Sequence, residues 1–316
     1  MAVDGAVLCR PSGGRPGAGR AQGGVRTLTG LPLTLDLQAP IDAALARLRE
    51  GSGAHCLSDH SFSNLYLFRE VHSYRFLPGE WPCISGLAYD GSRHLMPLFE
   101  PAAAPRDVWA ELLQGHGHVY PVAARHADGL PTGLFEISDS RDDADYLFAA
   151  SDFVDYPGRA LAKKRNLLRQ FHAAHVPHAE PFSDELAEAA RQVLRGWMAQ
   201  KEKNPGEADE AACLEAIALH ARFGLEGFVY FAEGQPMGFV LAQELQPGVF
   251  VMRFAKGLDS HAGLYPFMFQ HFCREFARPV AWLNFEQDLG IAGFRRSKLS
   301  YQPRALLSKF RLRLRA

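Results

Sequence analysis

The sequence has few cysteines and no long hydrophobic run, and both absences narrow what the chain can be. Its five cysteines are scattered along 316 residues without a C-x-x-C pair. An odd number without metal-type spacing favours free thiols in a reducing compartment, which predicts a cytoplasmic protein. No apolar run approaches the roughly 20 residues that span a bilayer, and the N-terminus lacks the basic and apolar regions of a secretion signal. We therefore expect a chain without a transmembrane segment.

The signatures of several common catalytic and metal sites are also missing. The sequence contains no G-x-S-x-G nucleophile elbow and no P-loop. His172, His175 and His178 have the spacing of a histidine cluster on a helix, but Pro177 would break the helix before the third one. Because no nearby cysteine or carboxylate completes a tetrahedral set, we expect no metal site here.

The net charge of −1 conceals a segregation of charge along the chain. Residues 136–155 are rich in acids, whereas residues 158–175 and 295–316 contain basic residues and no acids. Alternating solvated faces would explain this pattern. The two basic stretches could instead line one groove for a ligand that carries phosphate.

The length of the chain fits two domains better than one. Residues 1–28 are rich in Gly, Arg, Ala and Pro without periodicity, and we expect a disordered tail there. After that tail, an order of hairpin, helix and strand occurs twice. The first set is residues 83–89, 94–99, 107–114 and 119–123; the second is 228–232, 237–244, the strand 249–256, a helix from Pro266 and the strand 280–285. The repetition predicts an N-terminal domain over 31–160, a bridging helix over 158–177 and a C-terminal domain over 178–316.

The element order also predicts the fold class. Two helices precede the second hairpin, one capped by Ser183 and one over 207–223. Two helices, an antiparallel hairpin and a β-α-β tail are the order of a GNAT domain, which indicates a fold and no chemistry. We therefore expect an α+β (mixed α/β) protein with two tandem GNAT-like domains, each a mostly antiparallel central sheet flanked by helices. In Lys309–Arg315 the alternation of apolar and basic residues predicts a last strand with one wet face, whose cations discourage pairing at an exposed edge.

A polar cluster follows the predicted strand 280–285. Asn284, Glu286 and Asp288 stand at its end, where open α/β sheets gather their ligands. Lys298 and two arginines follow within about a dozen residues. A solvated loop with surface ion pairs is the alternative that these residues leave open.

Three stretches of this chain resemble one known family. The run from Asn284 to Pro303, NFEQDLGIAGFRRSKLSYQP, resembles a signature of the phosphatidylglycerol lysyltransferase C-terminal-domain-like family. Residues 163–171 resemble the K-K-R-N-x-x-x-x-F segment of that family, and residues 59–65 resemble its opening segment. The resemblance covers roughly residue 31 to the C-terminus. It implies tandem GNAT-like acyltransferase domains.

The resemblance further implies a transferase that moves an aminoacyl group from the 3′ end of aminoacyl-tRNA to a hydroxyl or amine acceptor, such as a small molecule or a lipid headgroup. Glu286 or Asp288 would be the general base, beside Asn284, with Tyr301 or Lys298 as acid or phosphate anchor. Arg253 and Lys256 would stabilise negative charge. The other candidate residues for binding the substrate and its phosphates are Lys163, Lys164, Arg165, Asn166, Gly263 and Tyr265.

Acyl-CoA is the alternative donor. Acetyl-CoA-dependent GNAT enzymes carry Q/R-x-x-G-x-G/A where a helix begins, so that backbone N–H groups grip the pyrophosphate. The corresponding residues 260–265 match at Gly263 alone, and Pro266 removes one N–H donor. This departure counts against acetyl-CoA without excluding a relaxed CoA site. A non-catalytic binder of nucleic acid or of anionic metabolites is a third interpretation.

The two signature stretches are expected to meet in space. An active site needs its groups within reach of one ligand. We therefore predict that residues 163–166 and 284–301 converge on one cleft.

Overall fold

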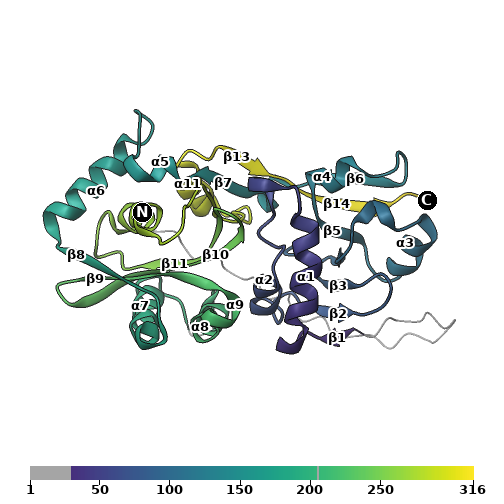
Figure 1. Ribbon diagram of the computed structural model, residues 1–316, viewed down its shortest axis with the longest axis horizontal. Helices are drawn as coiled ribbons and strands as arrows, with labels where there is room; N and C mark the ends of the chain where they lie inside the picture. Colours follow the sequence, from purple (N-terminus) through teal and green to yellow (C-terminus); the bar gives the residue numbers. More distant parts are fainter. Residues whose placement is uncertain (1–29, 205) are drawn as a thin grey trace. The chain divides into compact units, whose positions relative to one another are not determined.

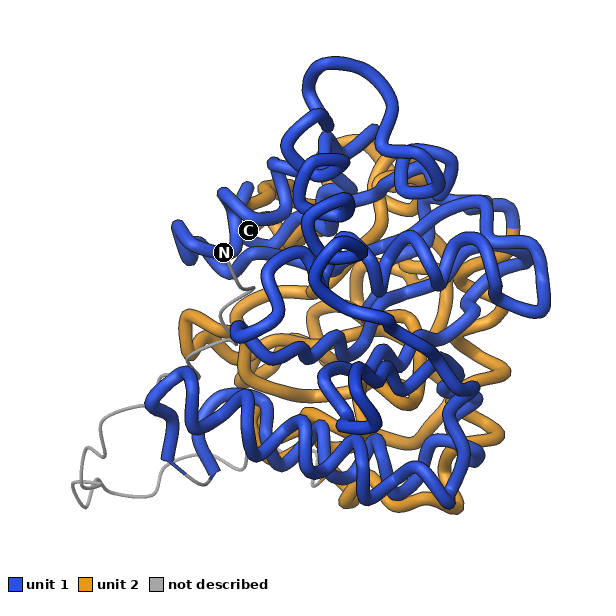
Figure 2. Tube along the Cα trace, turned by 90° about the vertical axis from the view of Figure 1, so that its left-hand side faces the viewer, with its two compact units in different colours: residues 1–7, 51–58, 141–308 blue, residues 8–50, 59–140, 309–316 orange. Residues whose placement is uncertain are grey.

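The computed structural model describes residues 30–204 and 206–316, so the tail expected over 1–28 lies outside the described residues. The described residues form two compact units (Figure 2). Unit 1 contains residues 51–58 and 141–308, and unit 2 contains residues 30–50, 59–140 and 309–316. Among the described helices, none is long and apolar enough to cross a membrane.

Unit 1 is built on a seven-stranded sheet with the order β13-β7-β12-β11-β10-β9-β8. Its neighbouring strands are antiparallel, except that β11 and β12 run parallel. A parallel pair needs a long crossover, and α10 (Leu264–Glu275) supplies it. The strands are β7 (Asp145–Ala149), β8 (Pro177–Pro181), β9 (Leu225–Ala232), β10 (Gln235–Gln246), β11 (Val249–Gly257), β12 (Trp282–Asn284) and β13 (Ala305–Leu307).

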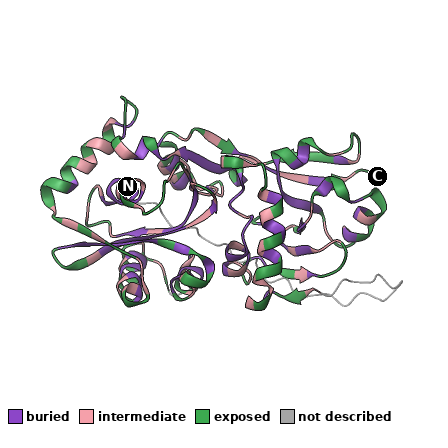
Figure 3. Ribbon diagram, in the orientation of Figure 1, coloured by how far each residue is buried: buried purple, intermediate pink, exposed green. Residues whose placement is uncertain are grey.

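Helices cover both faces of this sheet. One face carries α7 (Ala187–Gln200), α8 (Glu210–Ala218) and α9 (His220–Phe223), and the other carries α5 (Ser151–Asp155), α6 (Ala162–Ala174) and α10 (Figure 1). A further helix, α11 (Ala292–Leu299), follows β12. The core between α10 and the sheet is largely aromatic, with Phe171, Tyr230, Phe250 and Phe272 fully buried. Figure 3 shows the buried residues concentrated along the strands and on the inner sides of the helices.

Unit 2 has a second seven-stranded sheet, with the order β1-β2-β3-β4-β5-β14-β6. Again one neighbouring pair, β4 and β5, is parallel, and α3 (Arg106–Leu112) connects its strands. Trp109 of α3 is fully buried in the core of this unit, where its ring contacts Phe135. The strands are β1 (Leu31–Pro32), β2 (Arg75–Leu77), β3 (Cys83–Leu87), β4 (Arg93–Pro97), β5 (His118–Ala123), β6 (Phe135–Asp139) and β14 (Lys309–Leu314); the other helices are α1 (Gln38–Arg49), α2 (Phe62–Leu67) and α4 (Ala124–Asp128).

The two sheets repeat one plan. In each, an antiparallel hairpin leads to a strand, a crossover helix and a parallel strand. The predicted α+β class, with two mostly antiparallel sheets flanked by helices, is confirmed. Smaller differences concern element lengths: the helix expected over 207–223 is divided into α8 and α9, and β12 is shorter than the strand expected over 280–285.

Strand pairing crosses the predicted domain bounds in two places. β7, which falls in the expected domain 31–160, pairs with β12 and β13 in unit 1. β14, which falls in the expected domain 178–316, lies between β5 and β6 in unit 2. The helix expected to bridge the domains, α6, packs on α10 inside unit 1 and buries Phe171 there. The residue pattern of a strand shows which of its faces is apolar, but it does not show which strand is its neighbour. The sequence therefore did not reveal that β7 and β14 are exchanged between the two predicted domains.

The position of β14 overturns the expectation of an exposed edge strand. β14 pairs on both sides, so it has no open edge to protect. Lys309 is fully buried, and its Nζ lies 2.6 Å from Oδ2 of Asp59. Arg311 forms an ion pair with Asp90. Lys309 and Arg311 of this strand are therefore partners of acids within unit 2.

Candidate functional site

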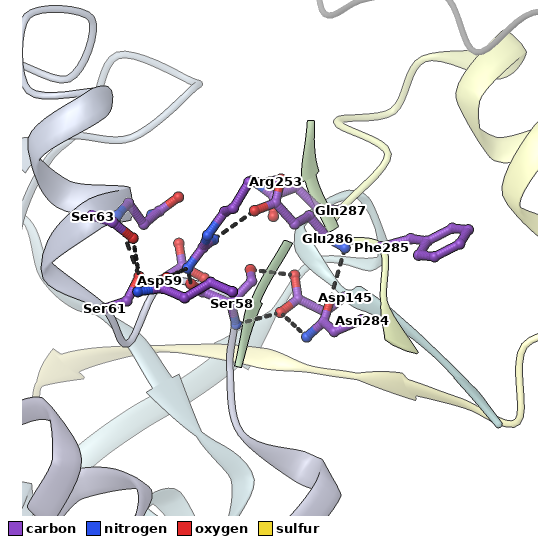
Figure 4. A network of polar contacts seen from close by, with 12 residues as sticks. Ser58, Asp59, Ser61, Ser63, Asp145, Arg253, Asn284, Phe285, Glu286 and Gln287 are labelled. Carbon is purple, nitrogen blue, oxygen red and sulfur yellow. Dashed lines mark hydrogen bonds and ion pairs between the residues drawn. The ribbon is translucent and has the colours of Figure 1, made fainter. Parts of the chain in front are cut away.

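The candidate site lies where two parallel strands of unit 1 stop pairing. β11 and β12 are in register from Val249 opposite Trp282 to Val251 opposite Asn284. β12 ends there, while β11 continues to Gly257. Arg253 projects from the part of β11 that extends beyond β12 and pairs with β10 alone, and Glu286 follows the end of β12 (Figure 4). The end of pairing thus places a cation and a carboxylate from two strands beside each other.

Arg253 and Glu286 form a close ion pair. Nη1 of Arg253 donates to Oε1 of Glu286 at 2.6 Å, and Nη2 donates to the carbonyl oxygen of Ser58 at 2.8 Å and to Oε1 of Gln243 at 3.2 Å. The arginine side chain is 1% exposed, whereas the Glu286 side chain is 24% exposed. The guanidinium is therefore fixed, and the carboxylate keeps one side that a ligand can reach.

The environment of Glu286 favours proton transfer. Burial raises the pKa of its carboxyl group, and the nearby Arg253 acts in the opposite direction. A carboxylate whose pKa is moved toward neutrality is suited to accept a proton from an acceptor amine or hydroxyl. Among the residues predicted as the base, Glu286 has the surroundings that this role requires.

Two neighbouring side chains fix the backbone around Glu286. Glu286 has a φ of 56°, a left-handed conformation that is costly for a residue with a side chain. Its N–H donates to Oδ1 of Asn284 at 2.7 Å. Nζ of Lys298 donates to the carbonyl oxygens of Phe285, Glu286 and Gln287 at 2.6, 3.1 and 2.5 Å. Asn284 and Lys298, predicted as a catalytic residue and a phosphate anchor, therefore hold the loop that presents Glu286.

A buried aspartate lies behind this loop, and sequence reasoning missed it. Asp145, at the start of β7, accepts hydrogen bonds from the backbone N–H and the hydroxyl of Ser58, at 2.8 and 3.0 Å, and from Nδ2 of Asn284 at 3.0 Å. Both Asp145 and Asn284 are fully buried. The available signal was an acid at the head of the apolar run Asp145–Ala149, but the exchange of β7 hid its partners.

Asp288, the other predicted base, is occupied by an ion-pair network. It is fully buried and accepts hydrogen bonds from Arg295 (Nε and Nη2, both 2.9 Å), from the Gly290 N–H (2.9 Å), from the Tyr146 hydroxyl and from Arg141 (3.3 Å). Burial disfavours its ionised form, but the hydrogen bonds from Arg295, Tyr146 and Gly290 outweigh burial and lower the pKa of Asp288 to about 2. These contacts anchor the loop between β12 and α11 through the Asp288 carboxylate.

Three other predicted residues make contacts that hold unit 1 together. Nζ of Lys256 lies 2.7 and 2.9 Å from the two carboxylate oxygens of Asp209 and 3.9 Å from the centre of the Trp197 ring. The hydroxyl of Tyr265 accepts the Gly257 N–H at 3.2 Å. At Gly263, which has a φ of 94°, an added Cβ would lie 2.3 Å from the carbonyl oxygen of Leu167. Glycine is thus required there by the close approach of α6.

The two signature stretches meet at one contact. Nζ of Lys164 lies 3.5 Å from the centre of the Tyr301 ring, which brings α6 to the segment after α11. Their convergence on one cleft stays a prediction. Burial and the neighbouring Lys163 lower the pKa of Lys164 to about 8, and burial raises the pKa of the Tyr301 hydroxyl. Lys163 and Asn166 are exposed on α6. Arg165 instead donates to the carbonyl oxygens of Tyr156 and Gly158.

The loop before α10 is a poor match to a CoA pyrophosphate site. The backbone N–H groups of His261 and Leu264 donate to the carbonyl oxygens of Leu258 and His261, at 3.1 and 3.0 Å. Pro266, in the first turn of α10, has no N–H. Phosphate binding at a helix start depends on such donors pointing at the ligand. At these three positions the loop therefore offers no free backbone donor to a pyrophosphate.

The chain is similar to known proteins in sequence and in structure. A family model described as "Phosphatidylglycerol lysyltransferase, C-terminal" matches residues 54–313. Among curated proteins, none matches. A conserved protein of unknown function from Bacteroides thetaiotaomicron VPI-5482 is 21% identical, with a TM-score of 0.73 over 92% of this chain and 100% of that chain. L-PGS from Bacillus licheniformis is 15% identical, with a TM-score of 0.56 over 87% of this chain and 92% of that chain.

These structural similarities concern the fold, because both identities are low. They agree with the two sheet plans described above, each a mostly antiparallel sheet flanked by helices.

Proposed function

Because the chain belongs to the phosphatidylglycerol lysyltransferase C-terminal family, we propose that this acyltransferase-like protein transfers an aminoacyl group from the 3′ end of aminoacyl-tRNA to an amine or hydroxyl acceptor. The observation that carries the proposal is the Arg253–Glu286 pair at the point where β11 and β12 stop pairing. It combines a proton acceptor with a fixed cation, which are the two groups that acyl transfer from an ester requires.

In the proposed reaction, Glu286 accepts the proton of the acceptor amine or hydroxyl as that group attacks the ester carbonyl of the donor. The new bond forms to the carbonyl carbon, and negative charge develops on its oxygen. The Arg253 guanidinium, held by Ser58 and Gln243 and buried away from direct contact with the substrate, stabilises that charge through its electrostatic field. The bond to the ribose oxygen then breaks, and the released ribose hydroxyl takes the proton from Glu286.

Cations on α6 support a donor that carries phosphates. This donor would bind outside the loop that holds the CoA pyrophosphate in acetyltransferases. Lys163 and Asn166 are exposed on α6, and Lys164 lies beside Tyr301 near the second signature stretch. In the loop before α10, the N–H groups of His261 and Leu264 are engaged and Pro266 has none, as described above. Binding of a polyanion such as tRNA by exposed cations weakens steeply as salt rises.

The test is a discharge assay with the purified protein. Aminoacyl-tRNA carrying a mixture of radiolabelled amino acids is incubated with phosphatidylglycerol vesicles in one arm and with a panel of soluble amines in another. We expect acceptor-dependent loss of label from the tRNA and its appearance in the acceptor. Release of label from acetyl-CoA with inert aminoacyl-tRNA would instead favour the N-acetyltransferase alternative. Saturable tRNA binding without turnover would favour a non-catalytic binder.

Glu286→Gln tests the role of Glu286 in catalysis. It should lower turnover by roughly 10²-fold or more, the scale for a lost acid–base group. The melting temperature should also fall, because the buried Arg253 loses its charged partner and keeps only Ser58 and Gln243. Since the ionised carboxylate is the base and its pKa is raised, wild-type turnover should rise with pH through that pKa, and the variant should lose this limb. Glu226→Gln, which alters another glutamate–arginine pair (with Arg278), is the matched control and should keep full activity. Unchanged turnover in Glu286→Gln with a lower melting temperature would refute the assignment.

A further inference from the structure

Three side chains able to bind a metal ion meet at one place in unit 1. His175 follows the end of α6, Glu233 lies in the turn between β9 and β10, and His261 lies in the loop between β11 and α10. One ring nitrogen of each histidine and one carboxylate oxygen of Glu233 lie within 4.8 Å of one another. Segments far apart in the sequence therefore bring two imidazoles and a carboxylate together.

His175 is the least satisfied member of this cluster. Its Nδ1 is buried and has no hydrogen-bond partner among the described residues. That atom lies 3.5 Å from Oε1 of Glu233, too far for a good hydrogen bond. The His175 and His261 rings lie beside each other at an angle of 48°, with their centres 4.8 Å apart. A buried polar atom without a partner is uncommon in proteins and requires an explanation.

We propose that His175, Glu233 and His261 bind a divalent transition metal ion of the zinc class. Imidazole and carboxylate groups are typical zinc ligands, and three protein ligands leave a fourth position for water. Ligands at about 2.0–2.1 Å from a tetrahedral zinc are about 3.4 Å apart. Glu233 is 61% exposed on its turn, so its side chain is free to rotate toward the two histidines.

The proposed ligand set differs from the histidine cluster that the sequence suggests. His178 lies near Glu180, with its Nε2 at 3.3 Å from the carboxylate, and His172 packs edge-on against Phe267. The expectation that no metal binds at residues 172–178 considered only ligands close in sequence. His261 and Glu233 are distant in sequence, and each comes from a separate loop.

A metal ion at this position would connect the end of α6, the hairpin turn and the loop that precedes α10. Gly263, at the end of the same loop, already packs against Leu167 of α6. The ion would therefore stabilise the α6–α10 junction. Because it binds the folded state, it should raise the melting temperature in proportion to the logarithm of its concentration above Kd.

The test uses tag-free protein that has been treated with a chelator and then dialysed. Titration calorimetry with Zn²⁺ should give one saturable site per chain, and Zn²⁺ should raise the melting temperature. Co²⁺ should give a visible spectrum without a thiolate charge-transfer band, since the ligands are imidazole and carboxylate. His261→Gln and Glu233→Gln should each weaken Zn²⁺ binding by more than about tenfold, since even loss of an outer-shell partner costs that much.

His220→Gln is the matched control, because His220 is also a histidine beside a carboxylate, 3.1 Å from Asp184. It should bind Zn²⁺ as the wild type does. Glu233 is exposed, so Glu233→Gln keeps the test valid if His261→Gln fails to fold. The proposal is overturned by the absence of saturable binding in the wild type, by wild-type affinity in Glu233→Gln, or by a strong thiolate band with Co²⁺.

Discussion

Replacing Asp288 by asparagine tests whether this buried carboxylate anchors the loop after β12 or takes part in proton transfer. The substitution keeps the shape of the side chain and removes its charge. Arg295, which donates to Asp288 with Nε and Nη2, then loses its buried partner. Removing one partner of a buried ion pair costs about 3–5 kcal/mol, because the remaining charge is left uncompensated. Arg295 is 33% exposed and keeps Asp142 at 2.5 Å, so we expect the lower end, about 3 kcal/mol.

Urea denaturation at pH 7 measures this loss as a change in the free energy of unfolding. Asp142→Asn is the matched control, because it removes the exposed partner of the same arginine. That change should cost about 1 kcal/mol at most, since exposed pairs contribute little. If Asp288→Asn unfolds within about 1 kcal/mol of the wild type while its turnover collapses, the anchoring role is refuted.

The same variant has a defined pH signature. The pKa of Asp288 is lowered to about 2, against about 3.9 for an unperturbed aspartate. Its contribution to stability is therefore complete above the unfolded pKa and is lost as pH falls from about 4 to about 2. The wild type should lose stability relative to Asp288→Asn across that window. If the difference in free energy of unfolding between the wild type and Asp288→Asn is the same at each pH, the Asp288 carboxylate does not contribute to stability.

Two further substitutions test contacts that support the site. Gly263→Ala should destabilise the protein by about 2 kcal/mol or more, because the new Cβ would lie 2.3 Å from the Leu167 carbonyl oxygen. Gly158→Ala is the control, because Gly158 also has a positive φ, 74°, but open space around it. Its cost, about 1 kcal/mol, measures the backbone strain alone. Lys298→Met should lower both stability and turnover, because Nζ no longer holds the backbone on either side of Glu286, and it should leave the salt dependence of donor binding unchanged. A reduced salt slope in that variant would show that Lys298 contacts phosphate.

Local features of the sequence were enough to predict the repeated hairpins and crossover helices. Asp90-Gly91 and Glu233-Gly234 mark turns because glycine accepts positive φ, and both glycines have it. The spacing of apolar residues likewise identified the helix α10. In the structure, Met268 and Phe272 of this helix are fully buried.

Partnerships across long sequence distances could not be predicted in the same way. Lys256 is a cation at the end of a strand in the sequence, and only the fold brings Asp209 to it. Asp145 reaches Asn284 because β7 joins the sheet of unit 1. Glu286 could be singled out by its place after a strand, but its raised pKa depends on burial, which one sequence does not give.

The exchange of β7 and β14 sets an order for the synthesis and folding of the chain. The sheet of unit 2 needs β14, which follows the whole of unit 1 in the chain. Until β14 has left the ribosome, the facing sides of β5 and β6 lack their partner, and unpaired strand edges promote aggregation. Unit 1 contains β7 and ends at residue 308, so its sheet can be completed first. The half of the chain that is made first is therefore the last to finish folding.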